Sequence, residues 1–73
     1  MTIPKRGCAV WLETMDERII RFEFVRTTNV KKATDQAFAK WSQDPEVRDE
    51  KANVCGGLID MTPIGVLRRA GVL

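Results

Sequence analysis

Chemistry in this chain would have to come from two cysteines, Cys8 and Cys55, a single serine, Ser42, and ten carboxylates. Histidine, the commonest general base and metal ligand near neutral pH, does not occur in the 73 residues. A serine or cysteine nucleophile would therefore lack the imidazole that usually activates it. Two cysteines also cannot supply the four nitrogen or sulfur ligands of a structural zinc site. The sequence thus predicts a non-enzymatic protein with no catalytic residue, no metal site and no cofactor.

The length and composition predict a single small domain that spans residues 1–73. Hydrophobic residues make up 44% of the chain and charged residues 30%, which is ordinary for a folded protein and argues against disorder. No apolar run approaches the roughly 20 residues that cross a bilayer, and the N-terminal residues do not resemble a signal peptide. We therefore expect a cytoplasmic monomer with reduced cysteines and no membrane contact. Whether Cys8 and Cys55 lie close together is left open.

Charge is arranged in blocks along the chain. Residues 1–32 contain seven Lys/Arg and four Asp/Glu, for a net charge of +3, whereas residues 33–60 contain three and six, for a net charge of −3. The last 13 residues add Arg68 and Arg69 without an acid. Blocks of opposite sign allow a partner of either sign to be engaged.

Period-two alternation predicts a β-hairpin from residues 7–14 and 18–27, joined at 15–17 by a turn that must be wide because it lacks glycine. The strands are expected to align so that the residue numbers of cross-strand partners sum to 32, because only an odd loop brings the apolar faces together. The positions that would then share one face are Cys8, Val10, Leu12, Ile20, Phe22 and Phe24.

The same register would place Trp11 opposite Arg21 on the outer face of the hairpin. A guanidinium over an exposed indole contributes about 0.5–1 kcal/mol. Trp and Arg are also the residue types found most often as interface anchors. The alternative is that Trp11 packs beneath the C-terminal segment or the third strand.

A helix is predicted from Val30 to Trp41, capped by Thr28 or Asn29. Its apolar stripe occupies an arc of about 140°, the width of one buried face. The stripe consists of Val30, Ala33, Thr34, Ala37, Phe38 and Trp41. We expect Phe38 and Trp41 to pack on the face of the hairpin that carries Phe22 and Phe24.

Residues 44–51 begin with Asp44-Pro45-Glu46, which predicts a helix cap followed by one or two helical turns. This acidic stretch is interpreted as a solvated turn or as an acidic docking patch. A third strand is predicted at 53–61, where Gly56-Gly57 would introduce a bulge or allow close approach of another segment.

The C-terminal residues 62–73 predict a short helix from Ile64 to Ala70 that is ended by Gly71. This segment either docks on the domain or remains a mobile tail. The predicted fold is therefore α+β: a small antiparallel sheet, made of the hairpin and a third strand, packed on one main helix and followed by the C-terminal helix or tail.

Three functions are compatible with this sequence: a protein-binding regulator, a nucleic-acid-binding protein, and a dimerising or toxin-neutralising module that pairs through a free sheet edge. Acidic residues interleave with the basic ones, which argues against nucleic acid as the main partner. The candidate partner-binding residues are Lys5, Arg6, Trp11, Arg18, Arg21, Arg68 and Arg69.

In its size, its blocks of charge and its pattern of three strands and one main helix, the chain resembles the small host-takeover proteins of bacteriophages. Within that class it is most similar to the RNA-polymerase-binding transcription regulators of lytic Xanthomonas phages. The resemblance is one of overall character along the whole chain, and no individual residue is carried over from it.

This resemblance implies binding to the large subunits of the host bacterial RNA polymerase, in the host cytoplasm. It further implies displacement of the sigma factor, which inhibits transcription initiation, together with a role in antitermination and nucleic-acid contact within the complex. Small anti-CRISPR proteins share the same profile and are the alternative within the phage class.

Overall fold

The central strand of the sheet is β1 (Cys8–Thr14), in which apolar side chains occupy both faces, so that all residues from Cys8 to Leu12 are buried. The computed structural model describes residues 3–48 and 50–73. The other elements are β2 (Ile19–Val25), α1 (Val30–Trp41), β3 (Ala52–Leu58), the 3-10 turn η1 (Ile59–Met61) and α2 (Ile64–Arg69).

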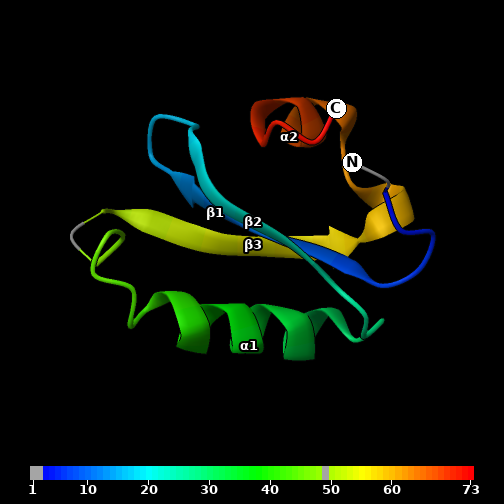
Figure 1. Cartoon of the computed structure of the whole chain (residues 1–73), viewed down its shortest axis with the longest axis horizontal. Helices are drawn as coiled ribbons and strands as arrows, with labels where there is room; N and C mark the ends of the chain where they lie inside the picture. Colours follow the sequence, from blue (N-terminus) through cyan, green and yellow to red (C-terminus); the bar gives the residue numbers. More distant parts are fainter. Residues whose placement is uncertain (1–2, 49) are drawn as a thin grey trace.

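The strand order is β2-β1-β3, with both pairs antiparallel, and the sheet lies between α1 on one face and α2 on the other (Figure 1). This confirms the predicted α+β fold with one main helix and a short C-terminal helix. The arrangement buries two separate apolar clusters, because each face of β1 needs its own cover.

The predicted hairpin register holds only next to the turn. Glu13 pairs with Ile19, whose numbers sum to 32, but a bulge then shifts the pairing so that Leu12 faces Arg21. Ile20 is the extra residue of the bulge. The turn spans residues 15–18 and is wide, as expected, with Glu17 in the left-handed region at a φ of 65°.

This one-residue shift moves the aromatic residues of β2 to the opposite face of the sheet. Trp11 pairs with Phe22, not with Arg21, and their rings stack with centroids 6.3 Å apart. Phe22 and Phe24 consequently pack with Trp11 on the α2 side. The prediction that they meet α1 is wrong, as is the predicted contact between Trp11 and Arg21.

Helix α1 has the predicted bounds, and its N-cap is Asn29, whose side-chain oxygen accepts a hydrogen bond from the backbone N–H of Lys32 at 3.1 Å. Ala33, Ala37 and Trp41 are buried against the sheet. Phe38, predicted to be buried with them, is 63% exposed. It lies at the margin of the apolar stripe, and the alanines allow the helix to sit too close to the sheet for a ring there to turn inward.

Gly56 on β3 marks the place where α1 approaches the sheet most closely. A Cβ atom at this position would lie 2.6 Å from Thr34 Cγ2 and 3.2 Å from Val10 Cγ1. The β1–β3 register continues without interruption through Gly56 and Gly57, so the two glycines do not form a bulge, and only Gly56 allows a close approach. The strand ends at Leu58, and the last residues of the predicted strand form η1.

Residues 42–48 form a series of turns in place of the predicted helix. The backbone N–H of Glu46 donates to Asp44 Oδ1 at 2.9 Å, and that of Val47 donates to the carbonyl of Asp44 at 3.2 Å. Asp49, which belongs to the same acidic stretch, lies outside the described residues.

The C-terminal segment is docked on the sheet. Val66 and Leu67 are buried, and Val66 joins the cluster that contains Trp11 and Ile59. Helix α2 ends at Arg69, and Gly71 follows its C-cap with a φ of 77°, which allows the backbone N–H of Val72 to donate back to the carbonyl of Leu67 at 2.9 Å. The sequence left open whether residues 62–73 dock on the domain or form a mobile tail, and in the structure they dock on the domain.

Candidate protein-binding surfaces

The side chain of Arg21 binds the acidic turn at residues 44–46. Its guanidinium binds Asp44 Oδ2 at 3.0 Å and Glu46 Oε2 at 2.7 Å, and it also donates to the carbonyl of Ile20. The hydrogen bond from the Glu46 backbone N–H, together with the Arg21 guanidinium, lowers the pKa of Asp44 below its ordinary value. Two carboxylates of the acidic stretch, those of Asp44 and Glu46, therefore neutralise a cation of β2, and the Glu46 side chain remains largely exposed.

Trp11 is a core residue with 8% of its surface exposed. It lies under the C-terminal segment in the cluster with Val66, and its indole N–H donates to Glu13 Oε1 at 3.2 Å. The alternative interpretation of this residue is thus the correct one. Buried in this way, the indole has no surface to offer a partner.

Two further candidate arginines bind acidic or carbonyl groups of the hairpin. Arg69 donates to the carbonyl of Glu17 at 2.7 Å and lies 3.5 Å from the carboxylate of Glu13, which ties α2 to the hairpin turn. Arg18 pairs with Asp16 at 2.9 Å on the same turn, and its side chain remains 59% exposed. Sequence alone did not reveal these partners because charge spacing does not specify which loops meet.

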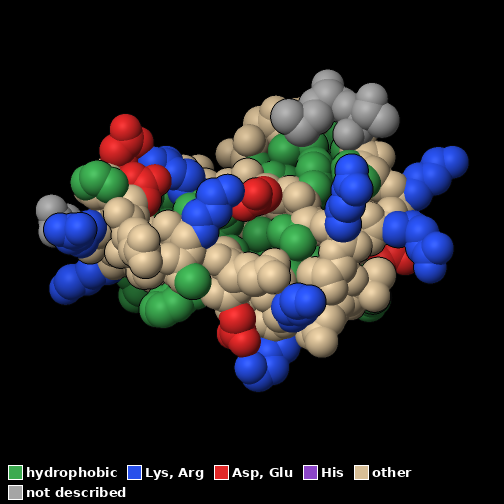
Figure 2. Space-filling model, turned by 60° about the horizontal axis from the view of Figure 1, so that its bottom comes forward, with side chains coloured by type: hydrophobic (Ala, Val, Ile, Leu, Met, Phe, Trp, Pro, Cys, Tyr) green, Lys and Arg blue, Asp and Glu red, His purple; other side chains and the backbone are tan. Residues whose placement is uncertain are grey.

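The remaining candidates, Lys5, Arg6 and Arg68, are exposed and make no ion pair within the described part of the chain. The seven candidate residues therefore do not form one basic surface. On the α1 side, Asp and Glu side chains and hydrophobic side chains lie between the Lys and Arg side chains (Figure 2).

The C-terminal segment combines exposed apolar side chains with an exposed cation. Met61, Ile64 and Leu73 are 76%, 59% and 60% exposed, and Arg68 lies one helical turn after Ile64 on the same side of α2. We call these four residues the C-terminal surface. Large apolar side chains beside a cation are typical of a protein-docking surface.

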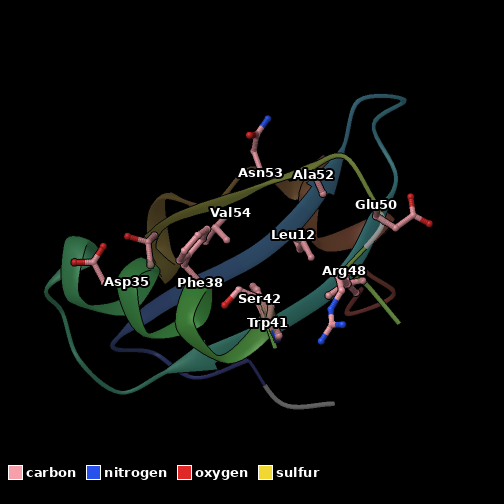
Figure 3. A pocket seen from close by; sticks show the side chains of 12 residues that line it. Leu12, Asp35, Phe38, Trp41, Ser42, Arg48, Glu50, Ala52, Asn53 and Val54 are labelled. Atoms are coloured by element: carbon pink, nitrogen blue, oxygen red, sulfur yellow. The ribbon is translucent and has the colours of Figure 1, made fainter. Parts of the chain in front are cut away.

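A second apolar site is a groove between α1 and the outer edge of β3 (Figure 3). Its volume is about 510 Å³, and Leu12, Trp41 and Val47 form its buried floor. Phe38 extends from α1 along one wall, and Val54 of β3 lines the groove opposite. Sequence reasoning missed this groove because it assigned Phe38 to the core.

No group of three or more His, Cys, Asp or Glu side chains that could hold a metal ion occurs among residues 3–48 and 50–73. The two cysteines, whose proximity was left open, are both free, with Cys8 buried on the α1 side and Cys55 half-buried on the α2 side. Burial and the nearby Glu13 carboxylate raise the pKa of the Cys55 thiol, so this cysteine is a weak nucleophile at neutral pH.

None of the described helices has the length and apolar character that a membrane crossing requires. Comparisons with protein-family models, curated protein sequences and solved structures give no match for this chain.

Proposed function

We propose that this protein is a non-enzymatic regulator that acts by binding another protein through its C-terminal surface. The observation that carries this proposal is the exposure of Met61, Ile64 and Leu73 on a segment that is docked through the buried Val66 and Leu67. A segment that is already folded loses less conformational entropy when a partner binds than a disordered one does.

The charge of this segment defines the chemistry of the partner. Residues 61–73 contain two arginines and no acid, and Glu13 partly neutralises Arg69, which leaves Arg68 to face a ligand. The complementary surface is therefore apolar with a carboxylate at its margin. Such a surface belongs to a folded protein more readily than to nucleic acid, whose backbone would require several unpaired cations on one face.

The specific partner that we propose is the host bacterial RNA polymerase, bound through its large subunits in the bacterial cytoplasm. The support is the resemblance to phage host-takeover proteins in size, charge distribution and element pattern. In this proposal the bound protein displaces the sigma factor, inhibits initiation and acts in antitermination. These effects need no chemistry, because a ligand shifts an equilibrium whenever it binds two states of its target with different affinity.

The proposal is tested by affinity capture from a bacterial lysate followed by mass spectrometry, with the full chain as bait. Ile64→Asp and Arg68→Glu alter the C-terminal surface, and an acidic residue at the start of α2 is compatible with the helix. Met15→Asp and Lys32→Glu are matched controls, because they place the same changes at exposed positions on the hairpin turn and on α1.

We expect the wild-type chain and both controls to capture the large polymerase subunits, and the two C-terminal variants to lose them. Capture of Cas proteins in place of polymerase would overturn the polymerase assignment in favour of the anti-CRISPR alternative. Equal capture by all five proteins would contradict the assignment of binding to the C-terminal surface.

A further inference from the structure

The two edges of the sheet differ in how they are protected from pairing. The β2 edge carries a bulge at Ile20 and the charged residues Arg21 and Glu23, two features that discourage another strand from adding. The β3 edge is seven residues long, contains no charged side chain and pairs with β1 without a bulge. An uncharged, regular edge of this length is a template for strand addition.

Hydrogen bonding shows which backbone groups this edge leaves available. The backbone N–H of Ile59 donates to the carbonyl of Gly7 at 3.1 Å. Because hydrogen-bonded and non-hydrogen-bonded pairs alternate in an antiparallel ladder, Cys55 and Gly57 direct their backbone groups toward β1. Val54, Gly56 and Leu58 therefore direct theirs outward, where an extended backbone is the natural partner.

We infer that the β3 edge pairs with the β3 edge of a second copy of this chain, antiparallel and across a two-fold axis at Cys55. In this register Val54 of one copy lies opposite Gly56 of the other, so the outward N–H and C=O groups of the two strands meet. This inference departs from the monomer expected from the sequence.

The position of α1 also fits a second copy. The helix packs mainly over β1 and β3 and reaches β2 through the Lys40–Glu23 ion pair. With strands spaced about 4.8 Å apart, a helix centred between β1 and β3 lies about 5 Å from the two-fold axis. The two copies of α1 would then be about 10 Å apart, close to the usual 8–10 Å packing distance of helices. Phe38, which lines the groove on this side, would fill the space between them.

The dimer would leave the C-terminal surface free, because α2 covers the opposite face of the sheet (Figure 1). The inference is therefore independent of the proposed function, and each can fail without the other.

The test is sedimentation equilibrium of the full chain over a micromolar to millimolar concentration series. We expect the apparent mass to rise from the monomer value of 8.3 kDa to twice that value. Val54→Pro, which removes an outward-directed backbone N–H from the edge and none from the β1 ladder, should shift the transition to at least about tenfold higher concentration. A wild-type chain that stays monomeric throughout would overturn the inference, and would leave this edge to an extended segment of a different protein.

Oxidative cross-linking with copper phenanthroline gives a second reading of the register. Cys55 would face its own copy as a non-hydrogen-bonded pair, with Cα atoms about 4.5 Å apart, which is within disulfide range. Each bond formed joins two thiol sulfurs, releases two protons and passes two electrons to the copper oxidant. We expect a cross-linked dimer from the wild type, much less from Val54→Pro and none from Cys55→Ser. A dimer that does not cross-link and is unaffected by Val54→Pro would show that another surface pairs, and would equally overturn the inference.

Discussion

The guanidinium of Arg21 on β2 binds the carboxylate of Asp44, which lies 23 residues further along the chain, through two hydrogen bonds of 3.0 and 3.2 Å to the same oxygen. Glu46 adds a third bond at 2.7 Å. The basic first part of the chain and the acidic middle part thus neutralise each other at this point within the fold. This contact links the segment between α1 and β3 to the edge strand β2.

We predict that this contact stabilises the protein above the ordinary pKa of an aspartate and that the stabilisation is lost in acid. The folded-state pKa of Asp44 is lowered below 3.8, mainly by the Glu46 backbone N–H and then by Arg21. A lowered pKa means that the unfolded state binds the proton more tightly, so stability falls as the pH drops from about 3.8 toward the folded-state value. Asp44→Asn should melt at a lower temperature than the wild type near neutral pH, and the gap should narrow in acid.

Glu17→Gln is the control for this pH dependence, because Glu17 is an exposed carboxylate whose side chain makes no ion pair among the described residues. Its melting temperature should follow that of the wild type across the same pH range. A difference between Asp44→Asn and wild type that stays constant down to the acid limit would contradict the assignment.

Gly56 and Gly57 provide a matched pair for the packing of α1 on the sheet. Gly56→Ala should destabilise the protein by about 1–3 kcal/mol, because the new methyl group would overlap Thr34 and the neighbouring Val10 must also yield. Gly57→Ala meets no atom within 4 Å and should change the free energy of unfolding by less than about 0.5 kcal/mol. Urea denaturation followed by circular dichroism measures both, and equal effects would disprove the close approach at Gly56.

Trp41 and Phe38 both belong to the predicted apolar stripe of α1, but their truncation to alanine should lower the free energy of unfolding by different amounts. Trp41 is 5% exposed, so Trp41→Ala should cost about 3–5 kcal/mol, a large part of the roughly 4–11 kcal/mol by which a chain of this length is stable. Phe38→Ala removes an exposed ring and should cost less than about 0.5 kcal/mol in dilute solution. Thermal melts at low protein concentration distinguish the two; a large loss with Phe38→Ala would mean that its ring is buried.

The two glycines of the C-terminal segment, Gly65 and Gly71, should change the free energy of unfolding in opposite directions when each is replaced by alanine. Gly71 has a φ of 77°, so Gly71→Ala should destabilise the docked segment by about 1–2 kcal/mol. Gly65 lies inside α2 with open space around it, so Gly65→Ala should stabilise the protein by about 0.4–1 kcal/mol. Native-state hydrogen exchange of the α2 amides reports both changes directly. Unprotected α2 amides in the wild type would contradict the docked conformation.

Local signals in the sequence were sufficient for the elements themselves. The apolar spacing after Thr28 or Asn29 predicted α1 with its observed bounds, and alternation predicted the two hairpin strands to within about two residues. The third strand was also predicted, but with its end three residues too late. The predicted hairpin register was wrong because the bulge at Ile20 turns every later side chain of β2 to the opposite face of the sheet. Ile19 and Ile20 are identical, so the sequence pattern does not show that one of them is the extra residue of a bulge.

The candidate binding residues were harder to assign, because exposure depends on contacts between distant segments. The sequence contained no sign that Asp44 would bind Arg21, and it offered the cover of Trp11 by the C-terminal segment only as an alternative. The apolar and basic character of the C-terminal segment, in contrast, was visible in the sequence. Only the structure separates its buried residues from the exposed Ile64 and Leu73.

The most direct test of the proposed function is calorimetric titration of the purified chain into purified bacterial core RNA polymerase, with Ile64→Asp and Met15→Asp measured in parallel. We predict saturable binding by the wild type and by Met15→Asp, and an affinity at least about tenfold lower for Ile64→Asp, because a charge would replace an apolar contact. Absence of binding by the wild type, or wild-type affinity for Ile64→Asp, would contradict the account.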